Sequence, residues 1–248
     1  MDRNYWEKIA PDYNEEIFDV LQNDKKRLIL SAIKKLASPS KTVIDIGCAV
    51  GKWLPVLAPS FKKVIAIDIS LKNLAIAQKS YPQYTNIDYQ RLDMSKNKTK
   101  IPVCDVAICI NAILTDSLKK RTVFFKNLSA TVKKGGALVL VVPSLESWLI
   151  TRIIQKKWKI DTSVFKDALS GKEAKKKYAN IQQGNADIDH VPTKHYLKEE
   201  LQLLLNQEGF TVTDSKKIEY DWKTEFLKPP AWLKEPKPWD WMVVAQRK

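Results

Sequence analysis

Five short apolar runs that alternate with helical segments constrain the fold of this chain more than any other feature. The runs are predicted strands and cover residues 42–46, 63–67, 87–90, 103–110 and 136–142. Between them, helical spacing of apolar residues predicts helices over 51–57, 71–80 and 117–132. Strands that alternate with helices form a parallel sheet whose two faces are covered by the crossover helices. The sequence therefore predicts an α/β fold with a buried, mostly parallel sheet.

The segments on either side of this region differ from it. Residues 1–40 carry apolar side chains at helical spacing, and Ser38-Pro39-Ser40 ends the pattern. A last amphipathic helix and two last strands are predicted over 195–208, 210–217 and 241–246. We predict a single domain with four parts, which are N-terminal helices (1–40), a core (41–143), a helical insertion without clear strands (144–192) and a C-terminal part with a helix, final strands and an aromatic loop (193–248).

The chain is strongly basic, with a formal net charge of +14 at pH 7. Only six of its 42 basic residues are arginine, the residue that makes bidentate contacts with phosphate and guanine. The lysines are spread along the whole chain. This distribution favours a solvated surface over a nucleic-acid site, although clustered lysines can also attract nucleic acid.

The cysteines and the N-terminus bear on the cellular compartment. Cys48, Cys104 and Cys109 are an odd number, and the last two stand in runs that are predicted to be buried strands. A reduced, intracellular protein fits this usage best. The first residues lack the apolar segment of a signal peptide, and no apolar run approaches the roughly 18 residues of a membrane span. The sequence predicts a cytoplasmic protein without a transmembrane segment.

The turn after the first predicted strand is the most informative segment, and it reads Asp45-Ile46-Gly47-Cys48-Ala49-Val50-Gly51. Gly47 allows a tight turn, and Gly51 allows the backbone to approach a ligand closely. Asp68 ends the next predicted strand about 20 residues later, where an acid accepts hydrogen bonds from a ribose in dinucleotide folds. The turn and the acid together predict a ribose-containing ligand.

The nicotinamide fingerprint is incomplete in this turn. G-x-G-x-x-G requires a third glycine, whereas this sequence has Gly47-x-Ala49-x-Gly51 followed by Lys52. The phosphate loop G-x-x-x-x-G-K-[ST] is absent from the sequence as well. NAD(P) is therefore disfavoured as the ligand.

The turn resembles motif I of the class I S-adenosylmethionine-dependent methyltransferases, whose pattern is D/E-x-G-x-G-x-G. Asp45, Gly47 and Gly51 match the pattern, and Ala49 replaces its middle glycine. Other segments resemble family segments in the same order along the chain, namely Asp68 after strand two, 90–94 after strand three, 104–111 along strand four and 133–140 along strand five. Residues 6–13 resemble the N-terminal helix of the small-molecule branch, where an aromatic side chain closes over the cofactor.

This resemblance implies a Rossmann-like, seven-stranded, mostly parallel sheet with helices on both faces, an antiparallel last strand and a helical lid inserted after strand five. It implies S-adenosyl-L-methionine as the cofactor. Asp68 is expected on the ribose, Asp93 on the adenine amino group and Asn111 beside the methionine part, while Cys48 is expected to pack as a small apolar residue. The implied cofactor-binding residues are Tyr13, Asp45, Gly47, Cys48, Gly51, Asp68, Ile69, Asp93, Met94 and Asn111.

The acceptor of the methyl group is predicted from the histidines and the aromatic residues. His190 and His195 stand just before the last predicted helix, where the carboxyl ends of the strands should lie. Both are candidate catalytic residues, because histidine is the commonest general base near neutral pH. The alternative for His195 is that it caps or packs the start of its helix. Trp148, Tyr196 and Trp222 are candidate contacts with a small-molecule acceptor.

Several alternatives remain open at the level of the sequence. The lysine-rich segment 172–177 could serve an RNA or protein methyltransferase, and a silent cofactor-binding subunit would need the same cofactor residues. The amphipathic segment 145–158 either forms a lid over the cofactor, which we favour, or lies on a membrane surface with its basic residues at the flanks. No cluster of cysteine and histidine suggests a metal, and a homodimer is left open.

Overall fold

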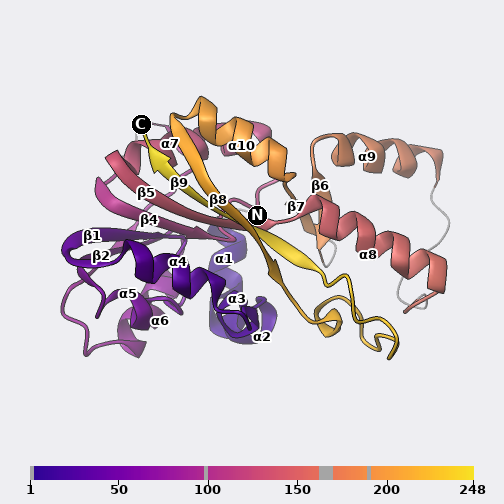
Figure 1. Ribbon diagram of the computed structural model, residues 1–248, viewed down its shortest axis with the longest axis horizontal. Helices are drawn as coiled ribbons and strands as arrows, with labels where there is room; N and C mark the ends of the chain where they lie inside the picture. Colours follow the sequence, from indigo (N-terminus) through magenta and orange to yellow (C-terminus); the bar gives the residue numbers. More distant parts are fainter. Residues whose placement is uncertain (1–2, 98–99, 162–169, 189–190) are drawn as a thin grey trace.

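A seven-stranded sheet forms the centre of the computed structural model, which describes residues 3–97, 100–161, 170–188 and 191–248 (Figure 1). The strand order is β3-β2-β1-β4-β5-β9-β8. The strands span Ser38–Ile46 (β1), Phe61–Asp68 (β2), Ile87–Arg91 (β3), Cys104–Ile110 (β4), Val132–Pro143 (β5), Phe210–Glu219 (β8) and Trp239–Arg247 (β9). Strands β1 to β5 pair in parallel, whereas β9 is antiparallel to both β5 and β8. The predicted mostly parallel sheet with an antiparallel last strand is confirmed.

Helices cover both faces of this sheet and enclose two cores. The first core lies under α7 (Leu118–Thr131) and α10 (Lys198–Gln207), and the second lies under α4 (Leu28–Leu36), α5 (Leu54–Leu57) and α6 (Leu71–Ser80). The strands contribute to both cores, because successive side chains point to opposite faces. Ile44 and Ile46 lie in the first core, and Val43 lies in the second. Burial on both faces explains why apolar runs, not alternating patterns, mark these strands.

The observed strands extend beyond the predicted ones where they leave the core. β1 begins at Ser38 instead of residue 42, and β5 begins at Val132 instead of residue 136. Most of the added residues are exposed or half-buried, yet they still pair, with Ser38 opposite Phe61. An apolar run therefore marks only the buried part of a strand, since backbone pairing needs no apolar side chain.

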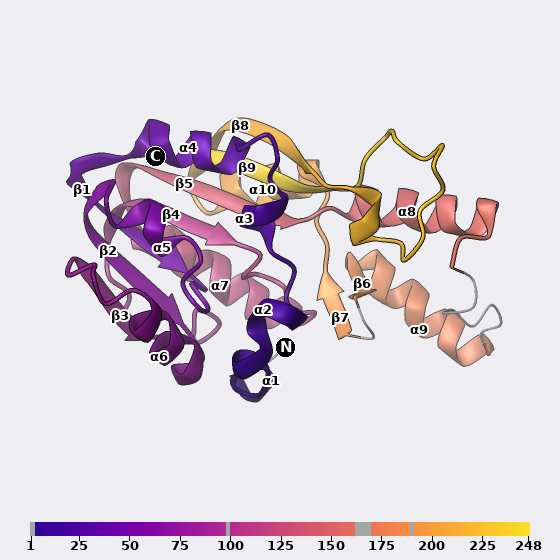
Figure 2. The same cartoon turned by 90° about the horizontal axis from the view of Figure 1, so that it is seen from below.

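Short helical segments precede α4, and they are α1 (Arg3–Ile9), the 3-10 helix η1 (Ala10–Asp12), α2 (Tyr13–Glu16) and α3 (Val20–Asn23). The periodicity of residues 1–40 suggested longer helices, but the backbone is extended at Ile17, with φ −111° and ψ 127°. This break lets the chain turn back toward the sheet. Figure 2 shows α1 and α2 on the side of the sheet where the parallel strands end, which we call the carboxyl edge.

Residues 145–161, 170–188 and 191–194 follow β5 and form a lobe beside the carboxyl edge (Figure 1). This side lobe contains α8 (Leu145–Trp158), α9 (Gly171–Gln182) and the antiparallel strands β6 (Asn185–Ile188) and β7 (Val191–Lys194). The prediction of an insertion without strands is therefore wrong. The two strands are short and polar, so no apolar pattern marks them. Contacts with the core hold them, since the Asn185 side chain accepts from Arg121 at 3.3 Å and the Lys194 N–H donates to the Leu114 carbonyl.

The helix predicted over 195–208 begins at Lys198, because Tyr196 pairs with the end of β5. The Tyr196 N–H donates to the Pro143 carbonyl, and the Leu145 N–H donates to the Tyr196 carbonyl. After α10, the loop between β8 and β9 projects beyond the sheet on the same side as α8 (Figures 1 and 2). In the described part of the chain, no helix combines the length and apolar character that crossing a bilayer requires.

Candidate functional site

The turn between β1 and α5 contains three residues with positive φ, namely Gly47 (72°), Ala49 (49°) and Gly51 (83°). The N–H groups of Gly47 and Cys48 donate to the Ile67 carbonyl at 2.8 and 2.9 Å, which ties the turn to the end of β2. The Gly51 N–H donates to the Cys48 carbonyl at 2.8 Å and closes the loop. The turn is thus a rigid backbone feature at the carboxyl edge.

Side chains are excluded from two of these positions. A Cβ atom at Gly47 would lie 2.6 Å from the Cβ of Ala112, and one at Gly51 would lie 2.7 Å from Cδ1 of Leu54. Ala49 is tolerated in the left-handed region although this costs an ordinary residue about 1–2 kcal/mol. Its N–H donates to the Asp68 carboxylate at 3.0 Å, a charge-assisted bond that offsets part of this cost.

Two buried carboxylates flank the turn. Asp68 ends β2, and its two oxygens accept from the N–H groups of Ala49 and Ser70 at 3.0 and 2.8 Å. A carboxylate offers about four lone-pair positions, so Asp68 can accept further donors. Asp45 is 2% exposed, and its Oδ2 has no hydrogen-bond partner among the described residues. Burial, and then the charge of Asp68, raise the pKa of Asp45 to about 7. Because buried polar atoms are normally hydrogen-bonded, this oxygen is an acceptor that a bound cation or donor would satisfy.

A second buried acceptor follows β4. Asn111 has φ 48°, and its Nδ2 donates to Oδ2 of Asp240 at 3.0 Å, while its own Oδ1 has no partner among the described residues. The Tyr220 hydroxyl donates to the same Asp240 oxygen at 2.9 Å. Burial raises the pKa of Asp240. Asp240 was not predicted as a site residue, and its one signal in the sequence is an acid inside the apolar run 239–244.

Tyr13 brings the N-terminal segment to the two carboxylates. Burial, followed by the electrostatic effect of Asp68, Cys48 and Asp45, raises the pKa of Tyr13. Its ring centroid lies 6.4 Å from that of Trp6. Tyr13, the aromatic residue expected over the cofactor, therefore lies within electrostatic range of Asp45 and Asp68.

Glu7 anchors this N-terminal segment. Its two carboxylate oxygens accept from the N–H groups of Leu71 and Lys72 at 2.9 and 3.2 Å, in the first turn of α6. Although burial works in the opposite direction, these bonds lower the pKa of Glu7. A second link joins Lys52 to Asp19 at 2.8 Å. No local pattern in the sequence marks Glu7, because its partners stand 64 and 65 positions away along the chain.

The remaining residues expected at the cofactor lie at the same edge. Asp93 follows β3, and its Oδ1 accepts from the N–H and the hydroxyl of Ser95 at 2.9 and 2.6 Å. Met94 is 4% exposed and belongs to the first core, and Ile69 is half-buried after β2. Cys48 is a free, buried cysteine whose pKa burial raises, which fits packing and not nucleophilic attack.

His195 lies between β7 and α10 and is 3% exposed. Its Nδ1 is 3.0 Å from the Thr193 carbonyl oxygen. A carbonyl only accepts, so Nδ1 carries the proton and the neutral ring keeps a lone pair on Nε2. Burial, and then the charges of Lys194 and Arg152, lower the pKa of His195 to about 4. The Trp148 ring centroid is 6.3 Å away, so the structure brings these two predicted site residues together.

The side chains of two other residues that were predicted to contact the methyl acceptor pack away from His195 and Trp148. Tyr196 is fully buried, and its hydroxyl donates to the Ile113 carbonyl at 3.0 Å. Trp222 is 3% exposed and stacks on Phe226 in a cluster against α8. A role in acceptor binding stays a prediction for both, and their packing does not favour it. His190 lies outside the described residues.

A cavity of about 490 Å³ lies at the opposite, amino-terminal edge of the sheet, with Lys41, Asp105 and Lys134 in its wall. It shares no residue with the candidate site. Asp105 there accepts from the Thr42 N–H and from Lys133 at 2.8 and 2.9 Å, as expected for a structural acid. Within the described ranges, no group of three or more His, Cys, Asp or Glu residues could hold a metal ion.

Comparison with known proteins decides the family. The profile of a family described as "Methyltransferase domain" matches residues 13–215, which include the turn, both buried carboxylates and His195. The chain belongs to this methyltransferase family. S-adenosylmethionine is its methyl donor, as the class I motifs implied. No curated protein matches the sequence of this methyltransferase.

Solved methyltransferase structures share the fold of this methyltransferase. An S-adenosylmethionine-dependent methyltransferase from Methanosarcina mazei is 16% identical with a TM-score of 0.62, over 87% of this chain and 96% of that chain. The N-methyltransferase NodS from Bradyrhizobium japonicum, in complex with S-adenosyl-L-homocysteine, is 12% identical with a TM-score of 0.62, over 99% and 97%. The magnesium protoporphyrin IX methyltransferase ChlM from Synechocystis, with the same product bound, is 15% identical with a TM-score of 0.58, over 99% and 98%. These likenesses establish the fold.

The hydrogen-bond acceptors at the candidate site of the methyltransferase fit S-adenosylmethionine. S-adenosylmethionine carries a cationic sulfonium, a cationic ammonium and two ribose hydroxyls. Among the residues that the structure describes, Asp45 and Asn111 each keep a buried oxygen without a donor, and Asp68 can accept further hydrogen bonds. The glycines at 47 and 51 leave no room for side chains where the backbone turns. A cationic ligand that carries hydroxyls meets these unsatisfied acceptors.

Proposed function

We propose that this methyltransferase transfers the methyl group to a small-molecule acceptor held at the carboxyl edge beside His195 and Trp148. The observation that carries the proposal is the neutral His195 ring, whose Nε2 has no hydrogen-bond partner among the described residues. Its neighbours Lys194 and Tyr196 bind the backbone at Leu114, after β4, and at Pro143, the end of β5. Trp148 adds an indole N–H that has no acceptor among the described residues. The names of NodS and ChlM, an N-methyltransferase and a porphyrin methyltransferase, are in line with a compact acceptor.

The cofactor-binding roles are part of this proposal. Asp68 accepts from the ribose hydroxyls, Asp93 accepts from the adenine amino group, and Asp45 and Asn111 face the cationic methionine end. The turn contributes backbone at Gly47, Cys48 and Gly51, while Ile69 and Met94 provide apolar walls and Tyr13 covers the site. When bound, S-adenosylmethionine supplies a methyl group that is already activated for an in-line displacement.

The protein then mainly positions the acceptor and excludes water. Nε2 of His195 accepts a hydrogen bond from the N–H or O–H of the acceptor, which aims the lone pair of the attacking atom. With a pKa of about 4, the ring stays neutral over the physiological range and acts as a fixed acceptor. It takes up a full proton only as the attacking atom becomes acidic on methylation. His190 stays a second candidate for the catalytic role.

A screen of small acceptors with radiolabelled S-adenosylmethionine tests the function directly. With an acceptor in hand, His195→Gln should lower kcat by about 100-fold, within the range of general acid–base effects. Its affinity for S-adenosylmethionine should stay unchanged in calorimetry. The wild-type pH–rate profile should lack an inflection from His195 near pH 6.5 and fall only toward its pKa of about 4. A folded His195→Gln enzyme with full activity would assign His195 to packing alone.

A further inference from the structure

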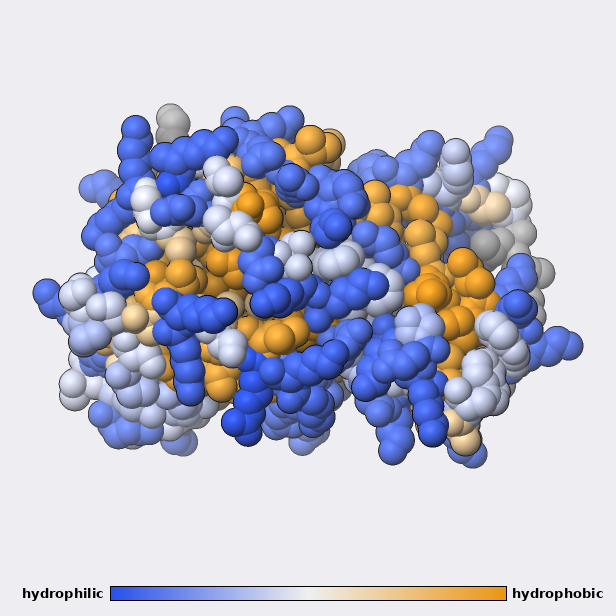
Figure 3. Space-filling model, in the orientation of Figure 1, coloured by the Kyte–Doolittle hydropathy of each residue, from blue (hydrophilic) through white to orange (hydrophobic). Residues whose placement is uncertain are grey.

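Large apolar side chains are exposed on α8 and on the loop between β8 and β9. They are Leu149 (38% exposed), Ile153 (62%), Trp158 (46%), Leu227 (80%) and Trp232 (55%), and together we call them the apolar lobe surface. Figure 3 shows hydrophobic atoms gathered over the side lobe in the orientation of Figure 1. Single exposed apolar residues are ordinary, whereas several on two neighbouring elements mark an interaction surface.

The two elements that carry this surface are fixed to each other. Ile154 and Ile160 on one side and Trp222, Phe226 and Leu233 on the other form a separate buried cluster between α8 and the loop. The rings of Trp158 and Trp232 contact each other across the two elements, with 5.1 Å between their centroids. In addition, the N–H of Leu227 donates to Asp161 at 2.7 Å. The exposed residues therefore form one structured surface.

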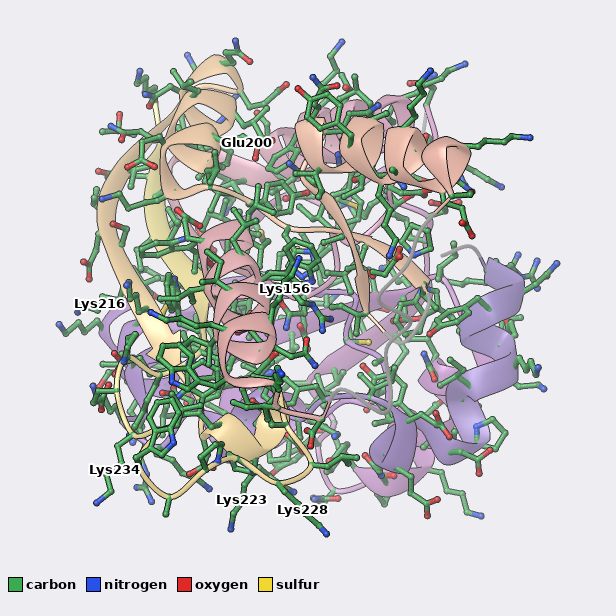
Figure 4. The ribbon with its side chains drawn as sticks, turned by 90° about the vertical axis from the view of Figure 1, so that its right-hand side faces the viewer. Lys156, Glu200, Lys216, Lys223, Lys228 and Lys234 are labelled. Carbon is green, nitrogen blue, oxygen red and sulfur yellow. The ribbon has the colours of Figure 1, made fainter. Side chains whose placement is uncertain are left out.

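Basic residues surround the apolar lobe surface. Residues 148–161 and 221–237 together contain eight basic and four acidic residues. Figure 4 shows Lys223, Lys228 and Lys234 pointing away from the loop. Among the residues that the structure describes, no carboxylate lies within 4.0 Å of these three amino groups. Lys157 lies over the Trp158 ring, with its Nζ 4.7 Å from the ring centroid. The surface therefore combines exposed apolar side chains with unpaired positive charge.

We propose that the apolar lobe surface docks this methyltransferase on the surface of an anionic phospholipid bilayer. Tryptophan rings are preferred at the boundary between headgroups and acyl chains, and aliphatic side chains enter the outer acyl region. Lysines around them reach the lipid phosphates. The α8 helix has 14 residues and no described helix can span a bilayer, so this association is confined to the interface. The proposal goes beyond the proposed function and does not depend on it.

The charge of the surface favours lipid over a second copy of the chain. A symmetric dimer through this surface would place the same lysines opposite one another, and like charges in contact disfavour association. Nucleic acid would use the lysines but would leave Ile153 and Leu227 without an apolar partner. An anionic bilayer provides both negative charge and an apolar layer beneath it, which matches the two features of this surface.

Sedimentation with vesicles tests the proposal on the full chain. The protein should co-sediment with vesicles that contain phosphatidylglycerol and phosphatidylcholine in equal parts. Much less of it should co-sediment with vesicles of phosphatidylcholine alone. The double variant Ile153→Gln, Leu227→Gln should lose about tenfold or more in partitioning, because its apolar insertion is removed. A matched control is Leu118→Gln, Leu203→Gln, whose residues are 63% and 65% exposed on α7 and α10. The control should bind as the wild type does.

The charged residues are tested in the same way. The triple variant Lys223→Glu, Lys228→Glu, Lys234→Glu should lose binding, whereas the control Lys34→Glu, Lys35→Glu, Lys119→Glu, on α4 and α7, should lose much less. Equal losses in the variants and their controls would overturn the proposal, as would absence of binding to anionic vesicles at low salt. Analytical ultracentrifugation tests whether a second copy of the chain binds the apolar lobe surface. A dimer that the Ile153→Gln, Leu227→Gln pair dissociates would assign the surface to a second copy instead.

Discussion

Asp45 and Asp68 are buried carboxylates at the ends of neighbouring strands, and in the described chain neither forms a salt bridge. Burial raises the pKa of Asp45 to about 7, with the charge of Asp68 as the second cause. The Asp45 carboxyl is therefore partly protonated near neutral pH. A bound cation favours the ionised form, so binding and proton release are coupled.

This coupling predicts a pH-dependent affinity for S-adenosylmethionine. Below pH 7 the Asp45 carboxyl must lose a proton before the cation binds, so affinity should fall by up to about tenfold per pH unit and should level off above pH 7. Calorimetry in two buffers with different ionisation enthalpies measures the released proton. Asp45→Asn should flatten the profile. A wild-type affinity that is constant from about pH 6 to about pH 8 would contradict the role of Asp45.

Asp68 should contribute directly to cofactor affinity. Asp68→Asn keeps the shape of the side chain but removes the charge, and Asp68→Ala removes all acceptors. We expect Asp68→Ala to weaken binding by about 2 kcal/mol or more, since hydrogen bonds to charged groups are worth roughly 1.5–3 kcal/mol. Asp105→Ala, at the opposite edge of the sheet, is the control and should bind normally. Equal affinities of a folded Asp68→Ala protein and the wild type would remove Asp68 from the site.

Some residues of the site were predictable from the sequence and others were not, for a physical reason. Asp45, Asp68 and the glycines stand in a local pattern, a strand followed by a turn, which the sequence displays directly. Asp240 contacts Asn111 across 129 positions of the chain, and Glu7 contacts Leu71 across 64. Such contacts depend on tertiary structure, so no local spacing reveals them.

At the level of elements, Glu7 makes the N-terminal segment a part of the site. Glu7→Gln replaces a charged acceptor of two backbone N–H groups with a neutral side chain that has one acceptor. We expect residues 3–16 to exchange amide hydrogens faster and the affinity for S-adenosylmethionine to drop several-fold, because Tyr13 is no longer held in place. Glu15→Gln, on the exposed side of α2, is the matched control. Unchanged exchange in residues 3–16 of the Glu7 variant would show that other contacts hold the segment.

Elements with a buried apolar pattern were predictable, and those held by polar contacts were not. The helix α6 spans the predicted residues 71–80, since its cap Ser70 and its buried face both show in the sequence. The hairpin of β6 and β7 has neither signal. It forms because Arg121, Asp116 and Leu114 of the core bind its backbone and its Asn185 side chain. Its place beside the site follows from these contacts.

On the scale of the whole molecule, the sheet order brings distant parts of the chain to one edge. Because β1 to β5 run in parallel, the turn after β1, Asp68 after β2, Asp93 after β3 and Asn111 after β4 all lie at the carboxyl edge. The antiparallel β9 begins there and adds Asp240. The alternation of strands and helices in the sequence predicts this convergence, whereas the contribution of β9 requires the pairing itself.

The net charge of +14 raises the question whether the acceptor is a nucleic acid. Binding that depends on charge alone falls steeply with salt, because counterions are released from the phosphates. Single-stranded RNA sites also interleave aromatic rings with arginines, whereas this chain has only six arginines, and the exposed rings of the apolar lobe surface occur together with exposed aliphatic residues. We therefore predict no tight RNA binding at physiological ionic strength and no methyl incorporation into RNA. Anisotropy titrations of labelled RNA at low and high salt, together with a radiolabelled methyl assay, measure both. Tight, salt-sensitive binding accompanied by methylated RNA would replace the small-molecule acceptor with RNA and would direct attention to the exposed lysines of α9.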